Sequence, residues 1–253
     1  MKLYLDKVHF IQTEEGIDLS IPLKDGEKNV NAWYADPVQI KPIAFGDFIG
    51  DVNQGGAVNF KTVLLNPHGN GTHTECVGHI SSEPYTINQC LRAHHFTGHV
   101  VTIQPKEMKN EGFDMVDHVI TKKSLVEKLN ASFEGKVLAI RTLPNGQEKK
   151  SRQYSDSNPP YLTAEAIQYI NEQGVEHLMV DLPSVDREDD GGALAAHRAF
   201  WNYPERPQTK KTITELIYIP NEVSDGYYFF QIQIMSIEMD ASPSKILLHH
   251  ILK

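Results

Sequence analysis

Lys136-Val-Leu-Ala-Ile-Arg141 begins the stretch that decides the fold, and His177-Leu-Met-Val-Asp181 ends it. Both are apolar runs with the length of buried β-strands. Between them, Thr163 precedes a segment of helical apolar periodicity at 164–170, and Gly174 follows it. Thr is a favoured helix N-cap and Gly a favoured helix stop. We therefore predict a strand–helix–strand unit, the crossover that joins two parallel strands.

Further elements are predicted on either side of this unit. Strands are expected at 3–5, 8–10 and 63–65, and 227–239 alternates at period two from Phe230 onward. Short helices are expected at 124–130 and 193–201. Two polar segments, 145–158 and 202–211, are predicted surface loops, and the first is a candidate lid. Together these elements indicate a mixed α/β fold, with residues 1–253 forming a single domain.

Composition restricts the class of partner. The chain has 253 residues and a formal net charge of -9, from 33 acidic and 24 basic residues. Nucleic acid and anionic membranes attract basic surfaces, so neither is the expected partner, whereas a small-molecule substrate remains open. The N-terminal segment is too polar for a signal peptide, and no run has the apolar length of a membrane-spanning helix. With only Cys76 and Cys90 as cysteines, we expect a cytoplasmic protein with free thiols.

One short segment concentrates side chains that bind metals. It is His68-Gly-Asn-Gly-Thr-His73-Thr-Glu75-Cys-Val-Gly-His79. Zinc and manganese accept imidazole nitrogen and carboxylate oxygen as ligands. In an extended segment His73 and Glu75 face the same way, and His79 joins them only if the extension persists. The surrounding glycines allow close backbone approach or positive φ angles.

Competing interpretations of this segment are weaker. The chain has 12 histidines, so some clustering arises by chance and spacing alone leaves metal binding open. His68-Gly-Asn-Gly resembles the oxyanion loop of serine esterases, but the sequence has no Gly-x-Ser-x-Gly elbow. The His-Glu-x-x-His pattern of zinc proteases is also absent.

A second group of acidic residues and a histidine follows the strand that ends at Asp181. Asp186, Glu188 and Asp190 are spaced as in a calcium loop, but His197 occupies the position where that loop needs a bidentate Glu. Further on, Glu215 lies in the apolar run 212–219 and shares its strand parity with isoleucines. A charged group in such a place is costly unless it is paired or bound to metal, so we expect Glu215 to point inward.

Taken together, these segments resemble the cyclase family of metal-dependent hydrolases, whose best-known members are bacterial kynurenine formamidases. The family hallmark is His-x-Gly-Thr-His-x-Asp-x-Pro-x-His, and residues 68–79 follow it. Supporting matches in the same order are Ile17-Asp18-Leu19-Ser20, Asp181-Leu-Pro-Ser184-Val185-Asp186, His197 and Glu215-Leu216. The resemblance spans roughly residues 16 to 217.

The resemblance implies a fold, an assembly and a set of roles. The implied fold is the swivelling β/β/α domain, a mixed sheet with flanking helices, and the implied assembly is a homodimer. The implied ligands of one or two divalent ions, Zn or Mn, are His68, His73, Glu75, His197 and Glu215. His79 matches the last hallmark histidine, which implies acid–base catalysis or a ligand role.

The sequence departs from the family pattern at several positions. Two residues rather than one separate His68 from Gly71-Thr-His73, so a small bulge is needed to bring His68 to a metal. Glu75 replaces the hallmark Asp and is one methylene longer, and Val77 replaces the Pro. The loop between His197 and Glu215 is long. These departures leave the substrate and the metal open.

The resulting functional hypothesis is hydrolysis of an amide, formamide or related carbonyl compound. A bound metal lowers the pKa of its water and polarises the carbonyl. His79 is the expected base, and Glu215 is expected to ligate metal and orient water. Five aromatic residues are candidates for an apolar pocket, although each is more often a core residue: Trp33, Tyr85, Phe96, Trp201 and Tyr203. The alternatives are a metal-dependent lyase or isomerase, and a non-catalytic metal- or ligand-binding protein.

Overall fold

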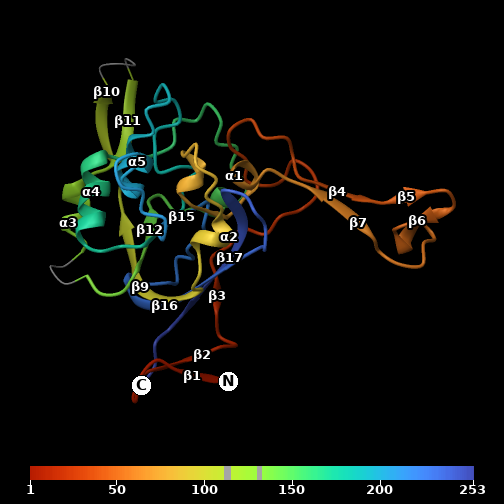
Figure 1. Ribbon diagram of the computed structural model, residues 1–253, viewed down its shortest axis with the longest axis horizontal. Coiled ribbons are helices and arrows are strands. Elements are labelled where there is room, and N and C mark those ends of the chain that lie inside the picture. Colours follow the sequence, from red (N-terminus) through yellow and green to blue (C-terminus); the bar gives the residue numbers. More distant parts are fainter. Residues whose placement is uncertain (111–114, 130–132) are drawn as a thin grey trace.

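Seven strands form a closed, mixed sheet in the computed structural model, which describes residues 1–110, 115–129 and 133–253 (Figure 1). Strands β9, β12, β14 and β15 are parallel, and the other neighbours in the ring are antiparallel. A short strand, β3 (Ile17–Asp18), adds to β17 from outside the ring. In ring order the strands are β16 (Gly226–Ile234), β9 (His95–Ile103), β12 (Val137–Thr142), β14 (His177–Val180), β15 (Thr212–Glu215), β8 (His73–Glu75) and β17 (Ala241–His249).

The predicted strand–helix–strand unit is confirmed. It consists of β12, the helix α4 (Ala164–Glu172) and β14, and the two strands pair in parallel. The Thr163 side chain accepts a hydrogen bond from the Ala166 amide and so caps α4, as expected of Thr at this position. Gly174 follows the helix with a φ of 77°, a conformation that favours glycine.

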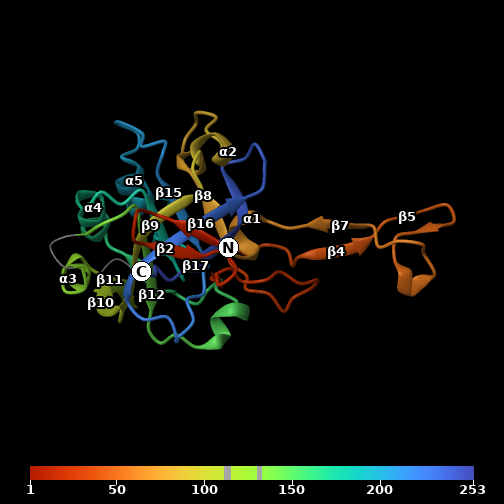
Figure 2. The same ribbon diagram turned by 90° about the horizontal axis from the view of Figure 1, so that it is seen from below.

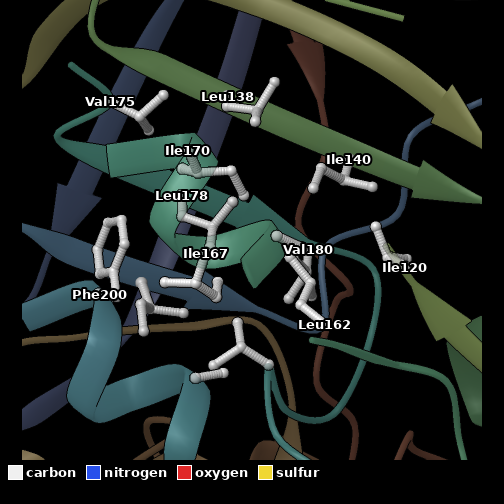
Figure 3. Close-up of a cluster of buried hydrophobic side chains, with 14 of the residues drawn as sticks. Ile120, Leu138, Ile140, Leu162, Ile167, Ile170, Val175, Leu178, Val180 and Phe200 are labelled. Carbon is white, nitrogen blue, oxygen red and sulfur yellow. The ribbon is translucent and has the colours of Figure 1, made fainter. Parts of the chain in front are cut away.

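The strands of this unit are apolar on both faces because each face packs against a separate core. Leu138 and Ile140 of β12 point outward and pack with α4 and with the helices α3 (Lys122–Val126) and α5 (Ala195–Trp201) (Figure 3). Val137 and Ala139 belong to the second core, which also contains residues of β16 and β17. Burial on both faces explains the uninterrupted apolar run in the sequence.

Both other predicted helices are present with shifted starts. Helix α3 begins at Lys122 rather than at residue 124, because the Thr121 side chain caps it by accepting from the Ser124 amide. It ends at Val126, and the final position of the predicted range, 130, lies outside the described residues. Helix α5 begins at Ala195 rather than at residue 193, because the amides of its first turn donate to the Asp186 carboxylate.

The C-terminal strand prediction is confirmed in its alternation but not in its length. Within β16, Phe230 and Ile232 are buried and Gln233 is exposed. The strand ends at Ile234, and residues 235–240 form a loop toward β17 whose first amide, that of Met235, donates to the Ser242 hydroxyl. The sequence predicts strand for residues 235–239, which belong to this loop.

The N-terminal strands form a hairpin of β1 (Lys2–Tyr4) and β2 (Phe10–Gln12). The second strand begins two residues later than predicted. The reason is a turn in which the Asp6 carboxylate accepts from the amides of Val8 and His9, which removes both residues from a strand ladder.

A long arm projects from the body of the molecule (Figures 1 and 2). It is formed by the pairs β4 (Gln39–Pro42) with β7 (Lys61–Leu64) and β5 (Ala44–Phe45) with β6 (Phe48–Ile49). The predicted strand at 63–65 therefore exists in part. However, Val63 and Leu64 are 54% and 58% exposed, so they are arm residues and not a buried strand.

The segment 145–158 is only partly the surface loop that its polarity predicts. Gln147–Ser151 forms a 3₁₀ turn that buries the Lys149 side chain. The Lys149 ammonium donates to the Asp181 carboxylate at 2.7 Å and to the Thr142 hydroxyl and carbonyl. A buried charge pair of this kind ties the segment to the ends of β12 and β14. Three of its residues line a cavity beside residues 26–38. Asp156 and Asn158 line another cavity together with Trp33 and Glu188, which also line the cavity of the candidate metal centre. The lid role of the segment stays a prediction.

The remaining elements are short or lie at the edge of the body. They are α1 (Pro67–Asn70), α2 (Ile87–Cys90), β10 (Lys106–Asn110), β11 (Met115–Ile120) and β13 (Tyr161–Leu162). In the described ranges, none of the helices has the length and apolarity that a membrane crossing requires.

Candidate metal centre

Strands β8 and β15 lie side by side and carry three of the predicted site residues. In their antiparallel register His73 lies opposite Glu215, and Glu75 lies opposite Ile213. His73 and Glu75 extend from the same strand at alternate positions, as the His-x-Glu spacing predicts. His73, Glu75 and Glu215 are all buried, and His73 Nε2 lies 3.4 Å from Glu215 Oε2. The inward position predicted for Glu215 is therefore confirmed.

Two short helical turns bring His68 and His79 to the same carboxylate. His68 comes from α1, which Asn66 caps by accepting from the Gly69 amide. Its Nδ1 lies 3.2 Å from Glu75 Oε2. His79 does not follow an extended strand, because β8 ends at Glu75 and a 3₁₀ turn at Val77–His79 follows. That turn leaves His79 Nδ1 3.7 Å from Glu75 Oε2.

His197 completes the cluster from helix α5. Its Nε2 lies 3.0 Å from Glu75 Oε1 and 3.8 Å from Glu215 Oε1. The structure thus brings together all six residues that the sequence singles out, from five separate elements.

The unused ring nitrogens and oxygens of this cluster converge. His73 Nδ1 donates to the Gly71 carbonyl at 2.9 Å, which leaves its Nε2 as an acceptor. His197 Nδ1 donates to Asp186 Oδ2 at 2.6 Å, and its Nε2 is directed at Glu75 Oε1. Within the described part of the chain, His73 Nε2 and Glu75 Oε2 are buried and make no hydrogen bond. Buried polar atoms are rarely left in this way without an ion or water. A set of imidazole nitrogens and carboxylate oxygens fits a divalent metal ion.

The electrostatics of the cluster favour a cation. Burial opposes ionisation of Glu75, yet the charge of His79, a hydrogen bond from His197 and the neighbouring His68 ring hold its pKa well below the usual value. Burial likewise opposes protonation of His68, but the hydrogen bond to Asp240 and the neighbouring Glu75 carboxylate raise its pKa to about 10. The carboxylates therefore favour protonation of the neighbouring histidines, and a metal ion competes with these protons for the ring nitrogens.

The glycines of the first motif allow close packing of the chain and do not adopt the positive φ angles that favour glycine. Glycines with positive φ lie elsewhere among the described residues, and neither Gly69 nor Gly78 is one of them. A Cβ on Gly78 would approach the Tyr85 carbonyl oxygen to 2.1 Å, and one on Gly69 would approach the Ala35 Cβ to 2.4 Å. The close approach predicted from these glycines is therefore to neighbouring segments of the chain.

A cavity of about 300 Å³ opens onto the cluster. His68, His79, His197 and Glu215 line it, together with residues of the loop before α5. Of the five aromatic residues considered for an apolar pocket, only Trp33 is in its lining. The other four pack in or against the apolar cores: Tyr85, Phe96, Trp201 and Tyr203. Phe96 also contacts the His177 ring. The aryl pocket prediction is thus reduced to one residue.

Comparison with known proteins agrees with this architecture. A family model described as "Putative cyclase" matches residues 17–187. The chain belongs to the Cyclase family. Among curated relatives, a kynurenine formamidase of Bacillus cytotoxicus is 25% identical over 239 residues, covering 94% of this chain and 99% of that protein. A kynurenine formamidase of Bacillus anthracis is 23% identical over 241 residues, covering 95% and 100%.

Solved structures share the fold. Isatin hydrolase A from Ralstonia solanacearum superposes with a TM-score of 0.65 at 15% identity, covering 94% of this chain and 92% of that one. A structure described as a potential metal-dependent hydrolase with cyclase activity gives a TM-score of 0.64 at 16% identity, covering 93% and 97%. The mixed α/β fold expected from the sequence is confirmed.

The structure adds two carboxylates that the sequence argument left unassigned. Asp186 belongs to the segment rejected as a calcium loop, and it anchors both the first turn of α5 and the His197 ring. Asp240 Oδ2 lies 2.9 Å from His68 Nε2 and 3.3 Å from His79 Nδ1. The Cyclase match ends at residue 187, before Asp240. The only signal for Asp240 in the sequence was a carboxylate directly after the predicted strand 227–239.

Proposed function

We propose that the protein is a metal-dependent hydrolase that cleaves the C–N bond of an amide or formamide in a small molecule. The observation that carries this proposal is the convergence of buried imidazole nitrogens on Glu75 and Glu215, with His73 Nε2 and Glu75 Oε2 left without hydrogen bonds in the described residues. Its membership of the Cyclase family and its similarity to kynurenine formamidases support the proposal.

The residues that would hold the metal are neighbours whose nitrogen and oxygen atoms face one another in the cluster: His68, His73, Glu75, His197 and Glu215. Two carboxylates among nitrogen donors suit Zn or Mn, as one ion or as two ions that share Glu75. When bound, the metal lowers the pKa of a water molecule and polarises the substrate carbonyl.

His79 is the proposed acid–base group. It lines the cavity, and its side chain is 30% exposed, whereas the side chains of His73 and His197 are buried. Hydrolysis adds water to the carbonyl carbon, breaks the C–N bond and protonates the departing nitrogen. In this proposal His79 takes the proton from the attacking water and returns it to that nitrogen, the role that histidine fills most often among side chains.

Glu215 has a second proposed role, the orientation of the attacking water. Its Oε1 accepts a hydrogen bond from the Val185 amide at 3.0 Å, which fixes the rotation of the carboxylate. A carboxylate fixed in this way accepts a hydrogen bond from the attacking water in one direction only.

The substrate class follows from the cavity. A volume of about 300 Å³ accommodates a small molecule, and Trp33 and Leu194 offer apolar contact beside the polar cluster. These features support an aryl formamide or a cyclic aryl amide. The second is the kind of compound suggested by the similarity in fold to isatin hydrolase A.

A substrate panel tests the proposal against its alternatives. The metal-loaded protein is incubated with an N-formyl aryl amine, a cyclic aryl amide, a lactone and a hydroxy acid that can only dehydrate. We expect hydrolysis of at least one of the two amides. Turnover of the hydroxy acid alone would favour a lyase, and metal binding without any turnover would favour a binding protein.

We further propose that the protein is a homodimer formed through the arm. Exposed apolar side chains gather there, with Phe45 64%, Phe60 53% and Leu64 58% exposed. An apolar surface on a projecting element is unfavourable in water and is typical of an interface. Light scattering is expected to give twice the chain mass, and Leu64→Asp is expected to shift the equilibrium toward monomer. Lys61→Gln on the same strand is the control. A monomeric wild-type protein would contradict the proposal.

Two further expectations are retained as proposals. β15, β16 and β17 lie beyond residue 187 and complete the ring, which supports one domain for residues 1–253. Cys76 and Cys90 are buried free thiols, as is usual in a reducing compartment, which supports a cytoplasmic location.

A further inference from the structure

Asp240 stands in a fixed position beside the candidate metal centre. It ends the loop between β16 and β17, directly before Ala241, which pairs with Glu75 in the sheet. Its backbone carbonyl accepts from the Cys76 amide at 3.0 Å, and the preceding carbonyl, of Met239, accepts from the Ile87 amide at 2.7 Å. Backbone contacts on both sides therefore hold the Asp240 carboxylate against the metal-binding segment.

The carboxylate contacts two histidines that differ in proposed role. One oxygen, Oδ2, lies 2.9 Å from Nε2 of the ligand His68 and 3.3 Å from Nδ1 of the base His79. The rings of these two histidines are neighbours, with centroids 4.4 Å apart. A single carboxylate therefore orients both rings.

Asp240 completes a pattern that the other histidine ligands follow. A metal-bound histidine usually donates its second ring N–H to an oxygen, which fixes the tautomer and the ring orientation. For His73 that oxygen is the Gly71 carbonyl, and for His197 it is Asp186. Asp240 takes this place for His68 and leaves Nδ1, the nitrogen 3.2 Å from Glu75, free for metal.

We infer that Asp240 is a positioning residue that holds His68 in ligand geometry and His79 in the tautomer required of a base. This inference rests on the proposed function. With its proton held on Nδ1, His79 keeps Nε2 as the basic nitrogen.

The test uses Asp240→Ala and Asp240→Asn, with Glu238→Gln as the matched control. Glu238 lies in the same loop, but its carboxylate bonds to Thr86, Asn88 and Gln89 and not to the metal cluster. Cobalt(II) affinity is measured by chelator competition and by the visible absorption spectrum, and kcat and KM are then measured at saturating metal. A thermal melt establishes that each variant is folded.

We expect Asp240→Ala to retain the wild-type number of ions and to bind them roughly 10–100-fold more weakly, since removal of such supporting groups has this effect. At saturating metal, kcat falls while KM changes less than about twofold, because His79 acts on the reaction and not on binding. Asp240→Asn keeps an acceptor oxygen and gives an intermediate loss in both readouts, and it serves as the informative variant if Asp240→Ala does not fold. Glu238→Gln behaves as wild type.

Two outcomes would overturn the inference while leaving the proposed function intact. In the first, wild-type metal affinity and kcat in both Asp240 variants would make the carboxylate a bystander. In the second, loss of one equivalent of metal would make it a direct ligand and not a positioning group. A wild-type protein that binds no divalent ion would instead overturn the proposed function, and the inference with it.

Discussion

At the scale of single residues, the chemistry of the candidate metal centre depends on which nitrogen of each histidine is free. His73, His197 and His68 each have one ring nitrogen occupied by an oxygen acceptor, and the other directed at Glu75 or Glu215. The resemblance to the cyclase family predicts which residues meet, and the His-x-Glu spacing and the inward parity of Glu215 support that set locally. It does not predict the acceptors. Asp240 is 172 residues from His68, and only the folded chain brings the two together.

Replacement of His79 tests the acid–base assignment. We expect His79→Ala to lower kcat about 10²–10⁴-fold, the usual contribution of such a group, with metal content unchanged. His118→Ala is the control, because His118 is a half-exposed histidine on β11. Steady-state kinetics with parallel metal analysis provides the measurement. Unchanged kcat in His79→Ala on every accepted substrate would refute the assignment.

His177 makes stability dependent on pH. Burial lowers its pKa to about 4, and its Nδ1 is 2.9 Å from the Thr212 hydroxyl. An unfolded chain takes up this proton near pH 6.5, so the contribution of His177 to stability is complete above that pH and is lost as the pH falls toward 4. The full difference is about 3 kcal/mol.

The matched variant His177→Gln isolates this effect from the other histidines. Urea unfolding of wild type and variant is measured between pH 7.5 and pH 4. The stability advantage of the wild type is expected to shrink as the pH falls. An advantage that stays constant over this range would contradict the assignment to His177.

At the scale of elements, local sequence signals explain the predictions that are confirmed, and long-range packing explains the errors. The crossover unit β12–α4–β14 follows from a capping Thr163, a helical apolar stripe and two apolar runs, all of which are local. The errors arise where a distant group intervenes. Lys149 is polar in sequence yet buried, because Asp181 lies beneath it, and Leu64 is apolar yet exposed, because its strand belongs to the arm.

Packing of α4 on the sheet is open to a direct test. Ile167 is fully buried among β12, β14 and α5 residues (Figure 3), so Ile167→Ala is expected to destabilise the fold by roughly 2–5 kcal/mol. Gln168→Ala, at an exposed position of the same helix, should change stability by less than about 0.5 kcal/mol. Chemical denaturation measures both. Equal stabilities would contradict the account of the core.

At the scale of the whole molecule, closure of the sheet unites residues that are remote in sequence. Strand β8 sits between β15 and β17, so the first motif meets Glu215 on one side and the loop carrying Asp240 on the other. The sequence indicates a mixed α/β fold, but ring closure depends on the pairing of β16 with β17, whose register has no local signature. The candidate metal centre therefore depends on closure of the sheet as well as on the first motif, residues 68–79.

The central claim is that these remote residues hold a metal. Its most direct test is a crystal structure of the protein loaded with Zn or Mn, with data collected at the absorption edge of that metal. The account predicts an anomalous peak about 2.0–2.2 Å from carboxylate oxygens of Glu75 and Glu215 and from ring nitrogens of His73, His197 or His68. Loaded crystals with no peak among these atoms, or with a peak elsewhere on the protein, would contradict it.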